Sequence, residues 1–526
     1  MSAVLSFPAT QDEIVTYNPA TGEEFGRVAN TSAEAVEKAV EKSRKAFQPW
    51  KETSFKERAR FVMRAREVIL AELDEIARLI SDESGKPIAE ALSMEIAPVL
   101  DLMQYFAKNA AKILKPERIN IGLYAMLGRS SKIIYKPLGT VGIIPAWNYP
   151  FSIPLGETAM ALMAGNCVIV KPSELTPFIG LKIGDIFEKA GLPDGVLQIL
   201  TGDGQTGATL VDQGIEKIMF TGSVATGKRI AESAAKHLTS VVLELGGKDP
   251  MIVFADANLE LAAQGAVWGA FCNSGQSCSS VERLYVEESV TEKFTRLIVE
   301  KTGQLNQDSG DKETTDVAAM SSERQIQIVE DHVESFRQEG AEILTGGRRN
   351  SKFKGAFYEP TVIGNATNQM RGMREETFGP TLPIATFTTE EEAIDLANDS
   401  DFGLTASVWT RDLAKGKRVA EKILAGTVCV NEVLYTHGIG QTPWGGFKQS
   451  GYGRTHGKQG LLELVAPQHI HVNRILLMPN AWWLPYSPLA VETFRGFARY
   501  FASGSLRQTM KLAPQLLKRL KELRKG

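Results

Sequence analysis

From about residue 139 onward, short apolar runs alternate with longer segments of helical periodicity, and this alternation restricts the chain to few folds. The runs are too short for helices and show no polar alternation, which is typical of strands buried on both faces of a parallel sheet. Helical segments between them supply the crossovers that parallel strands need. The pattern therefore predicts an α/β fold. Its first runs lie at 141–144, 167–170, 218–220 and 241–243.

A second series of apolar runs begins at 251–254 and predicts a second α/β domain. At 526 residues the chain exceeds one simple core, so we expect two or three domains. Helices are predicted over 32–50 and 54–82, the second opened by a capping box of Ser54 and Glu57. A Ser-Gly-Lys-Pro run at 84–87 should end it.

The composition indicates an ordinary globular protein, with 43% hydrophobic and 23% charged residues. A net charge of −3 gives the molecule no general attraction to nucleic acid. The four cysteines are too few for a disulfide framework, and their spacing fits no metal site. The N-terminus lacks the basic segment and long apolar stretch of a secretory signal, so we expect a cytoplasmic, reducing location.

Cys278 is the candidate nucleophile. A lone cysteine is more often an inert buried side chain, so its company matters. Glu244 opens a Glu-Leu-Gly-Gly-Lys run upstream, and a thiol with a carboxylate that activates water would serve one hydrolytic reaction. Asn148 lies in Pro-Ala-Trp-Asn-Tyr-Pro, and Glu376 in Glu-Glu-Thr-Phe-Gly-Pro. Taken one at a time, Asn148 could be a turn residue, Glu244 a charge at the end of a strand and Glu376 a surface acid. Taken together, they indicate an active site.

A glycine-rich turn at 220–228 follows one predicted strand and opens a helix. Gly222 and Gly227 permit a tight turn, and the helix after Ser223 would offer N–H groups to a phosphate. The string is not the common dinucleotide fingerprint, and an ordinary strand–helix turn explains it equally well. Lys171 and Glu174 follow the preceding strand, where a solvated surface pair is the simpler explanation.

The four motifs, in this order, resemble the aldehyde dehydrogenase superfamily over about residues 15–472. The resemblance implies a Rossmann-like NAD-binding domain, an α/β catalytic domain and a small β extension that joins subunits into a dimer or tetramer. The expected boundaries are 1–120 with 139–246 for NAD binding, 247–445 for catalysis, and 121–138 with 459–473 for the extension.

The resemblance also assigns roles. Cys278 would attack the aldehyde, Asn148 and the Cys278 backbone N–H would stabilise the oxyanion, and Glu244 would activate water for thioester hydrolysis. A carboxylate at Glu174 beside the ribose hydroxyls would favour NAD over NADP. The residues implied in cofactor binding are Trp147, Lys171, Glu174, Gly222, Ser223, Gly227, Glu376 and Phe378.

Three alternatives stay open: a coenzyme-A-acylating enzyme of this fold, a semialdehyde dehydrogenase, and a non-catalytic homologue. Acylating relatives generally lack the carboxylate found here at Glu244, so hydrolysis is favoured. Two positions depart from the tetrameric members, because Glu157 and Thr455 replace a lysine and a glutamate there. Glu157 is either an alternative acid or a helix-surface glutamate.

The predicted substrate tunnel is wide and apolar, without a carboxylate anchor. This expectation rests on small or apolar residues at places where relatives carry bulky or charged ones, and it favours long-chain or bulky hydrophobic aldehydes. Refilling of the space by neighbouring loops is the alternative. The predicted lining comprises Tyr149, Gly156, Cys272, Leu434 and Thr436.

The tail, 476–526, extends beyond most of the family and resembles the tryptophan-rich tails of carotenoid-dialdehyde dehydrogenases. Trp482 and Trp483 precede a basic helix expected at 512–525, with leucines 516, 517, 520 and 523 on one face and Arg519 among the basic residues opposite. Such a helix lies in a membrane interface or packs on a partner subunit. No apolar run approaches the roughly twenty residues needed to span a bilayer.

Overall fold

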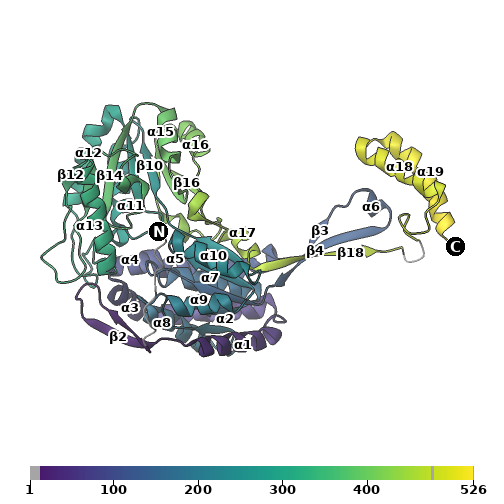
Figure 1. The fold of residues 1–526 in the computed structure, drawn as a ribbon, viewed down its shortest axis with the longest axis horizontal. Coiled ribbons are helices and arrows are strands. Elements are labelled where there is room, and N and C mark those ends of the chain that lie inside the picture. The colour runs from purple at the N-terminus through teal and green to yellow at the C-terminus, as the bar shows by residue number, and fades with distance from the viewer. Residues whose placement is uncertain (1–11, 476–478, 525–526) are drawn as a thin grey trace, which may run out of the picture. The chain divides into compact units, whose positions relative to one another are not determined.

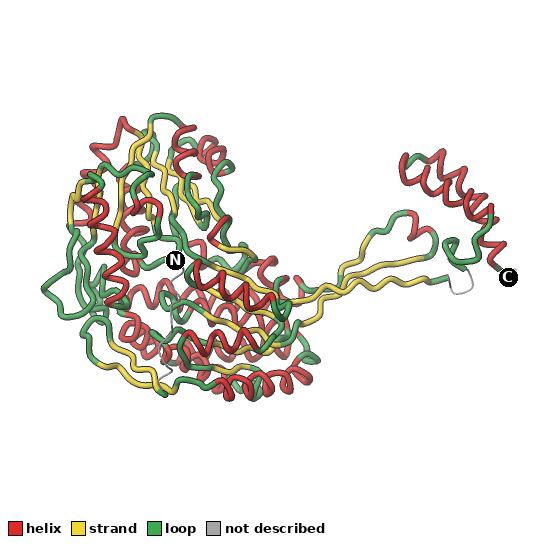
Figure 2. The backbone as a smooth tube through the Cα atoms, in the orientation of Figure 1, coloured by secondary structure: helices red, strands yellow, loops and turns green. Residues whose placement is uncertain are grey.

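The computed structural model describes residues 12–475 and 479–524. The chain forms two compact units. The first comprises residues up to 114 and 136–466, and the second comprises 115–135 and 467–526. Figure 1 labels the elements and Figure 2 separates helices from strands.

The N-terminal part of the first unit contains a hairpin of β1 (Glu13–Tyr17) and β2 (Glu24–Ala29), followed by α1 (Ala33–Trp50). The capping box of Ser54 and Glu57 is confirmed at the start of α2 (Phe55–Ala71). One continuous helix over 54–82 was the wrong prediction, because Glu72 leaves helical geometry with φ −111° and a separate α3 (Leu73–Ser84) follows. Gly85 ends α3 with φ 85°, which a glycine adopts without strain.

The first sheet confirms the predicted parallel arrangement. Its strands run in the order β17-β9-β8-β5-β6-β7, and only β17 (Gly451–Tyr452) is antiparallel to its neighbour. The chain order reverses between β5 and β8, and such a switch point opens a crevice at the carboxyl ends of the strands. The strands are β5 (Thr140–Ile144), β6 (Cys167–Val170), β7 (Leu197–Ile199), β8 (Lys217–Thr221) and β9 (Ser240–Glu244); the helices are α7 (Ser152–Ala164), α8 (Pro177–Lys189), α9 (Gly204–Asp212) and α10 (Val224–Ala235).

The predicted second α/β region forms a seven-stranded sheet, parallel except for β12. Alternation along β10 divides its core: Met251 and Val253 face α11 (Leu259–Phe271) and α12 (Glu288–Gly303), while Ile252 packs with side chains of α13 (Glu323–Gln338), α15 (Glu390–Asn398) and α16 (Leu413–Ala420). The strand order is β12 (Glu342–Thr345), β13 (Thr361–Gly364), β14 (Thr381–Phe387), β11 (Val281–Glu287), β10 (Asp249–Val253), β15 (Thr405–Trp409) and β16 (Thr427–Val430).

The two sheets meet where the chain passes from β9 to β10 through residues 245–248 alone. The carboxyl edge of the first sheet thereby faces the amino edge of the second, and the candidate site lies there. Short elements frame it: α4 (Ile88–Glu90), a π-helical turn η1 (Ala91–Ile96), α5 (Ala97–Ile113), α14 (Arg371–Arg374), α17 (Gly457–Leu462) and the 3₁₀ turns η2 (Cys272–Gly275), η3 (Tyr435–Gly438) and η4 (Lys448–Ser450).

The second unit contains a sheet of order β18-β4-β3 and a helical hairpin. Side chains of the hairpin helices pack around Ala481, Phe497, Leu512 and Leu516. None of the helices in the described ranges is long and apolar enough to cross a membrane. The elements are β3 (Glu117–Ile119), α6 (Leu123–Met126), β4 (Arg129–Pro137), β18 (Val465–Asn473), α18 (Pro488–Ser503) and α19 (Leu506–Leu523).

The hairpin corrects the predicted tail helix in two respects. Leu516 and Leu520 pack against α18, whereas Leu517 is exposed, so the leucines do not form one free apolar face. Arg519 is completely buried rather than solvated. Its guanidinium donates to the carbonyls of Trp483 and Pro485 at 2.5 and 2.7 Å, because that turn leaves carbonyls without helical partners.

Candidate active site

Cys278 lies on a strained turn between α11 and β11. Asn273 and Ser274 have positive φ values of 50° and 55°, which non-glycine residues rarely adopt. Hydrogen bonds hold this conformation: the Asn273 N–H donates to Glu90 Oε2 at 2.8 Å, and the Ser274 hydroxyl donates to the Ala318 carbonyl at 2.9 Å. The turn presents Cys278, partly exposed, at the amino end of β11.

The surroundings of Cys278 keep its thiol protonated. Burial raises the pKa of Cys278, and the negative charges of Asp249, Glu376 and Glu244 raise it further. These carboxylates therefore act on the predicted nucleophile. The loop after Glu244 also lies close to Cys278, because a methyl group at Gly247 would collide with the Cys278 carbonyl oxygen.

Asn148 lies in the loop after β5, and the structure brings it to the nucleophile turn. Its side chain is buried, and its Nδ2 donates to the Gln276 carbonyl at 3.1 Å. Asn273 Nδ2 donates to the carbonyls of both Asn148 and Gln276, each at 3.0 Å. One hydrogen-bond cluster thus joins the predicted oxyanion donor to the turn that carries the predicted nucleophile.

Glu244 ends β9 and is 6% exposed, yet neither carboxylate oxygen has a hydrogen-bond partner among the described residues. Buried carboxylates are normally paired, so this one is available to a reacting molecule. Burial raises the pKa of Glu244 well above its usual value, and the charge of Glu157 raises it further, whereas Arg454 lowers it. Gly445 leaves space for the group, since a Cβ there would lie 2.9 Å from Glu244 Oε1.

Glu157 is not a helix-surface residue. It lies on α7 with 4% exposure, and burial raises its pKa to about 8. Thr455, the second departure from the family pattern, pairs through its backbone with Trp444 and bonds His456 Nδ1 through its hydroxyl at 2.9 Å.

The nucleotide-side residues lie at the carboxyl edge of the first sheet. Ser223 caps α10, accepting from the Thr226 N–H, and so leaves the positive end of a twelve-residue helix at this edge. A Cβ at Gly222 or Gly227 would collide with Phe220 or Leu245, which explains the glycines.

Lys171 follows β6. It is buried, and its Nζ donates to the Asp203 carbonyl at 3.1 Å and lies 3.7 Å from Glu174. The Glu174 side chain is 51% exposed, so its carboxylate is available to hydroxyl groups of a ligand. The N-terminus of α10 together with an available carboxylate fits a dinucleotide.

Glu376 and Phe378 border the opposite side of the crevice. Glu376 Oε1 accepts from the Gly247 N–H at 2.8 Å; desolvation and then the charge of Glu282 raise its pKa to about 8. The Phe378 ring meets the Trp147 ring edge-to-face at 5.4 Å. Two of the eight predicted cofactor residues, Trp147 and Phe378, are therefore in contact.

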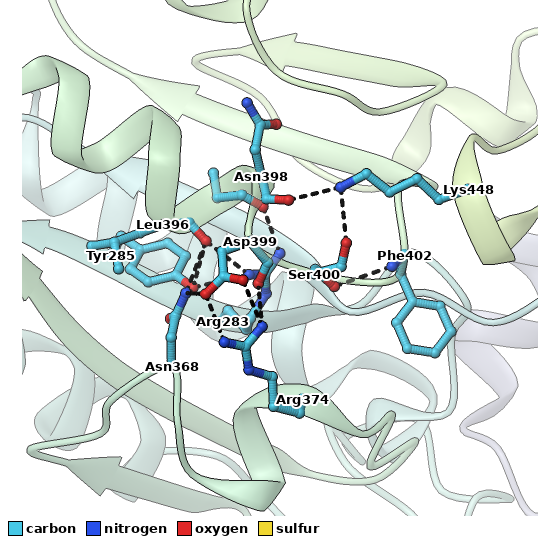
Figure 3. Close-up of polar contacts among 11 residues, drawn as sticks. Arg283, Tyr285, Asn368, Arg374, Leu396, Asn398, Asp399, Ser400, Phe402 and Lys448 are labelled. Carbon is cyan, nitrogen blue, oxygen red and sulfur yellow. Dashed lines mark hydrogen bonds and ion pairs between the residues drawn. The ribbon is translucent and has the colours of Figure 1, made fainter.

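A buried Lys248–Glu282 ion pair, 2.5 Å long, fixes this loop, because Glu282 also accepts from the N–H groups of Thr377 and Phe378. Arg283, next along β11, supports the pair by donating to the Lys248 carbonyl at 2.8 Å. Figure 3 shows Arg283 within a polar network that holds the 396–402 turn, in which Tyr285 donates to Asn368 and Arg374 forms two bonds to Asp399.

A cavity of about 360 Å³ reaches Cys278. Its lining contains no Asp, Glu, Lys or Arg side chain, in agreement with the expected apolar tunnel. Tyr149 and Leu434 line it as predicted, whereas Gly156, Cys272 and Thr436 do not. The lining residues are Ser93, Met94, Ala97, Pro98, Tyr149, Ser152, Ile153, Trp268, Ser277, Cys278, Ser279, Leu434, Tyr435, His437, Gly438 and Ile439.

The three misplaced residues have physical explanations. Beside Gly156 the space is filled by Leu102 of α5, whose Cδ2 would lie 3.1 Å from an added Cβ. Cys272 is 3% exposed and belongs to the core under α11. Thr436 lies on η3 between Tyr435 and His437, and these two neighbours reach the cavity instead.

Several site residues were not recognised from the sequence. His437 reaches the cavity, and burial lowers its pKa to about 4, so it is neutral there. The available signal for Glu95 was a charge within the mainly apolar run Ala-Leu-Ser-Met-Glu-Ile-Ala.

Comparisons with known proteins show the family of this chain. A model of the aldehyde dehydrogenase family matches residues 7–470. The 4,4'-diapolycopene aldehyde oxidase of Methylomonas sp is 39% identical over 510 residues, covering 97% of this chain and 95% of that protein. Betaine aldehyde dehydrogenase of Bacillus subtilis (strain 168) is 38% identical over 463 residues, covering 87% and 93%.

A putative succinate-semialdehyde dehydrogenase [NADP(+)] of Mycobacterium tuberculosis (strain ATCC 25618 / H37Rv) is 35% identical over 477 residues, covering 90% of each chain. Among solved structures, betaine aldehyde dehydrogenase of Staphylococcus aureus in complex with NAD+ superimposes with a TM-score of 0.86 at 33% identity, covering 90% of this chain and 94% of that one. The chain belongs to the aldehyde dehydrogenase family and is an oxidoreductase that acts on aldehydes.

Proposed function

We propose that this enzyme oxidises a bulky or long-chain hydrophobic aldehyde to the free carboxylic acid, with NAD as cofactor. The Cys278 thiolate attacks the aldehyde carbon, and Asn148 Nδ2 with the Cys278 N–H donates to the oxyanion that forms. NAD, held by residues that include Lys171, Glu174 and Glu376, would supply the hydride acceptor, and its positive nicotinamide ring would favour the thiolate over the protonated thiol. Water then hydrolyses the Cys278 thioester.

Glu244 carries the proposal of hydrolysis. A buried carboxylate without a hydrogen-bond partner, within electrostatic reach of Cys278, is suited to take the proton from an attacking water. Because its pKa is raised, the basic form of Glu244 increases with pH, and so should deacylation. Transfer to coenzyme A would not need this carboxylate.

The preference for NAD rests on Glu174. Its exposed carboxylate would accept from the ribose hydroxyls and would repel a 2′-phosphate. Because the M. tuberculosis relative is named for NADP, the preference should be tested by comparing kcat/KM for NAD and for NADP.

The proposed substrate class rests on the cavity. Its lining offers aromatic and aliphatic side chains and no cationic group to hold a second carboxylate, which speaks against small semialdehyde acids. The relative named for diapolycopene aldehyde, a long polyene, matches almost the whole chain.

The test is NADH formation with an aldehyde panel of rising chain length, with and without coenzyme A. We expect kcat/KM to rise towards decanal and longer chains, with acid as the product in both conditions. Dependence on coenzyme A would support the acylating alternative, and a maximum at succinic semialdehyde would support that substrate. No turnover of any aldehyde, with Cys278→Ala as baseline, would support a non-catalytic protein.

We also propose a cytoplasmic homo-oligomer, a dimer or tetramer, whose second unit contacts an anionic membrane. Residues 115–135 and 467–526 contain fourteen Lys and Arg against three Glu. Basic and apolar side chains together suit a membrane interface. The large exposed apolar side chains of the hairpin region include Trp483, Leu484, Tyr486, Phe501, Met510 and Leu517.

Co-sedimentation with phosphatidylserine vesicles tests the membrane contact, and truncation of 476–526 is the control. We expect binding that weakens as salt rises and that the truncation abolishes. Binding at the level of neutral vesicles, together with a smaller oligomer after truncation, would assign the hairpin to a partner subunit instead.

A further inference from the structure

A second buried ion pair lies behind the loop that carries Asn148. Lys86 Nζ is 2.5 Å from Glu95 Oε1, and both side chains are completely inaccessible. Burying two charges is unfavourable unless their remaining hydrogen bonds are satisfied, and such pairs seldom add stability. Lys86 and Glu95 therefore call for an explanation beyond stability, and their other contacts supply it.

Among the described residues, every further side-chain hydrogen bond of the pair goes to residues 148–152. Lys86 Nζ donates to the Asn148 carbonyl at 2.8 Å and lies 4.4 Å from the centre of the Tyr149 ring. Glu95 Oε2 accepts from the N–H groups of Phe151 and Ser152 at 2.8 and 3.0 Å. One charge pair thus fixes the backbone from Asn148 to Ser152.

The pair comes from elements outside the nucleotide-binding sheet. Lys86 follows the left-handed cap of α3, and Glu95 lies on the π-helical turn η1. A π-turn inserts an extra residue into a helix and is frequent at functional sites. Here it carries a carboxylate inward within an otherwise apolar run.

We propose that Lys86 and Glu95 are positioning residues for the oxyanion site. The Asn148 carbonyl accepts from Lys86 on one side and from Asn273 Nδ2, on the nucleophile turn, on the other. Both donors fix the peptide plane after Asn148 and with it the backbone from which the side chain projects, and the Gln276 carbonyl holds Nδ2. Lys86 acts through Asn148 and does not touch the substrate.

This inference rests on the role proposed for Asn148, and a double-mutant cycle tests it. The readout is the single-turnover rate of NADH formation with saturating NAD and decanal. Asn148→Ala should lower this rate by about 100- to 1,000-fold. Lys86→Met should lower it by about 10- to 100-fold while the Kd for NAD changes less than about twofold. In the Asn148→Ala background, Lys86→Met should have almost no further effect.

Lys86→Met leaves Glu95 unpaired, which threatens folding. The second variant is Lys86→Met with Glu95→Gln, in which the glutamine oxygen still accepts from Phe151 and Ser152. It should fold, bind NAD and show the same loss of rate. Lys217→Met is the control, since Lys217 is also buried and its pair with the partly exposed Glu463, at 2.7 Å, lies at the start of β8. It should leave the rate unchanged.

Multiplicative losses from Lys86→Met and Asn148→Ala would overturn the inference, because Lys86 would then act independently of Asn148. A wild-type rate in the Lys86→Met, Glu95→Gln variant would overturn it as well. No effect of Asn148→Ala alone would instead refute the role proposed for Asn148.

Discussion

Glu157→Gln should change the stability of the protein in a pH-dependent way. In the unfolded chain this carboxyl ionises near its ordinary pKa of 4.5, whereas burial raises the pKa to about 8 in the fold. Between these values the unfolded chain carries the ionised form while the folded chain keeps the proton. Stability contributed by the neutral carboxyl is complete below pH 4.5 and is lost as the pH rises towards 8.

The magnitude follows from the difference in pKa. Each pKa unit corresponds to about 1.4 kcal/mol, so ionisation of the unfolded chain disfavours folding by about 3 kcal/mol at pH 7 and about 5 kcal/mol near pH 8. Glutamine removes this dependence, but its buried amide costs about 1–3 kcal/mol where it lacks a partner. The variant should be less stable than wild type at pH 4.5 and more stable at pH 8.

The assay is denaturant unfolding of both proteins across pH 4.5–8.5, followed by circular dichroism. Glu67→Gln, at an exposed position of α2, is the matched control and should run parallel to wild type. Parallel curves for Glu157→Gln and wild type would refute the reasoning, because they would require Glu157 to be ionised within the fold at neutral pH.

Further variants test the chemistry and the hairpin. Cys278→Ala should abolish NADH formation and preserve NAD binding by titration, while Cys272→Ala stays active; residual turnover above about a tenth would exclude Cys278 as nucleophile. Glu244→Gln should release about one NADH per site and then stop, and loss of this burst would place Glu244 before hydride transfer. Glu174→Gln should narrow the ratio of kcat/KM for NAD over NADP, and an unchanged ratio would contradict its ribose contact. Arg519→Met should raise protease susceptibility of the hairpin, because it leaves buried carbonyls unpartnered; unchanged digestion would show the bonds to be dispensable.

Much of the fold follows from local pattern. Strand and helix periodicity predicted two parallel sheets, because burial on both faces leaves a continuous apolar run at each strand. The helix break at Glu72 was not visible, since only the torsion at that residue differs.

The candidate site, like the fold, was predictable where short motifs report it and not where distant packing decides it. Cys278, Glu244 and Asn148 were predicted because each lies in a distinctive short motif, and in the structure Glu244 acts electrostatically on Cys278 while Asn148 bonds to the turn that carries it. The tunnel was predicted less well, because Leu102, from a helix more than fifty residues earlier, decides whether Gly156 opens a space. The Lys86–Glu95 pair likewise depends on how α3 and η1 pack around a loop far along the chain, and no spacing rule reports that.

The carboxylates around Cys278 also bear on oxidative damage. Peroxides attack a thiolate rather than a thiol, and the first product, a sulfenic acid, proceeds to irreversible sulfinic and sulfonic forms. With its pKa raised by burial and by three neighbouring negative charges, Cys278 presents little thiolate to oxidants. Inactivation of the free enzyme by hydrogen peroxide should therefore be slow at neutral pH. The surroundings that keep the Cys278 thiol protonated therefore also protect it from oxidation between turnovers.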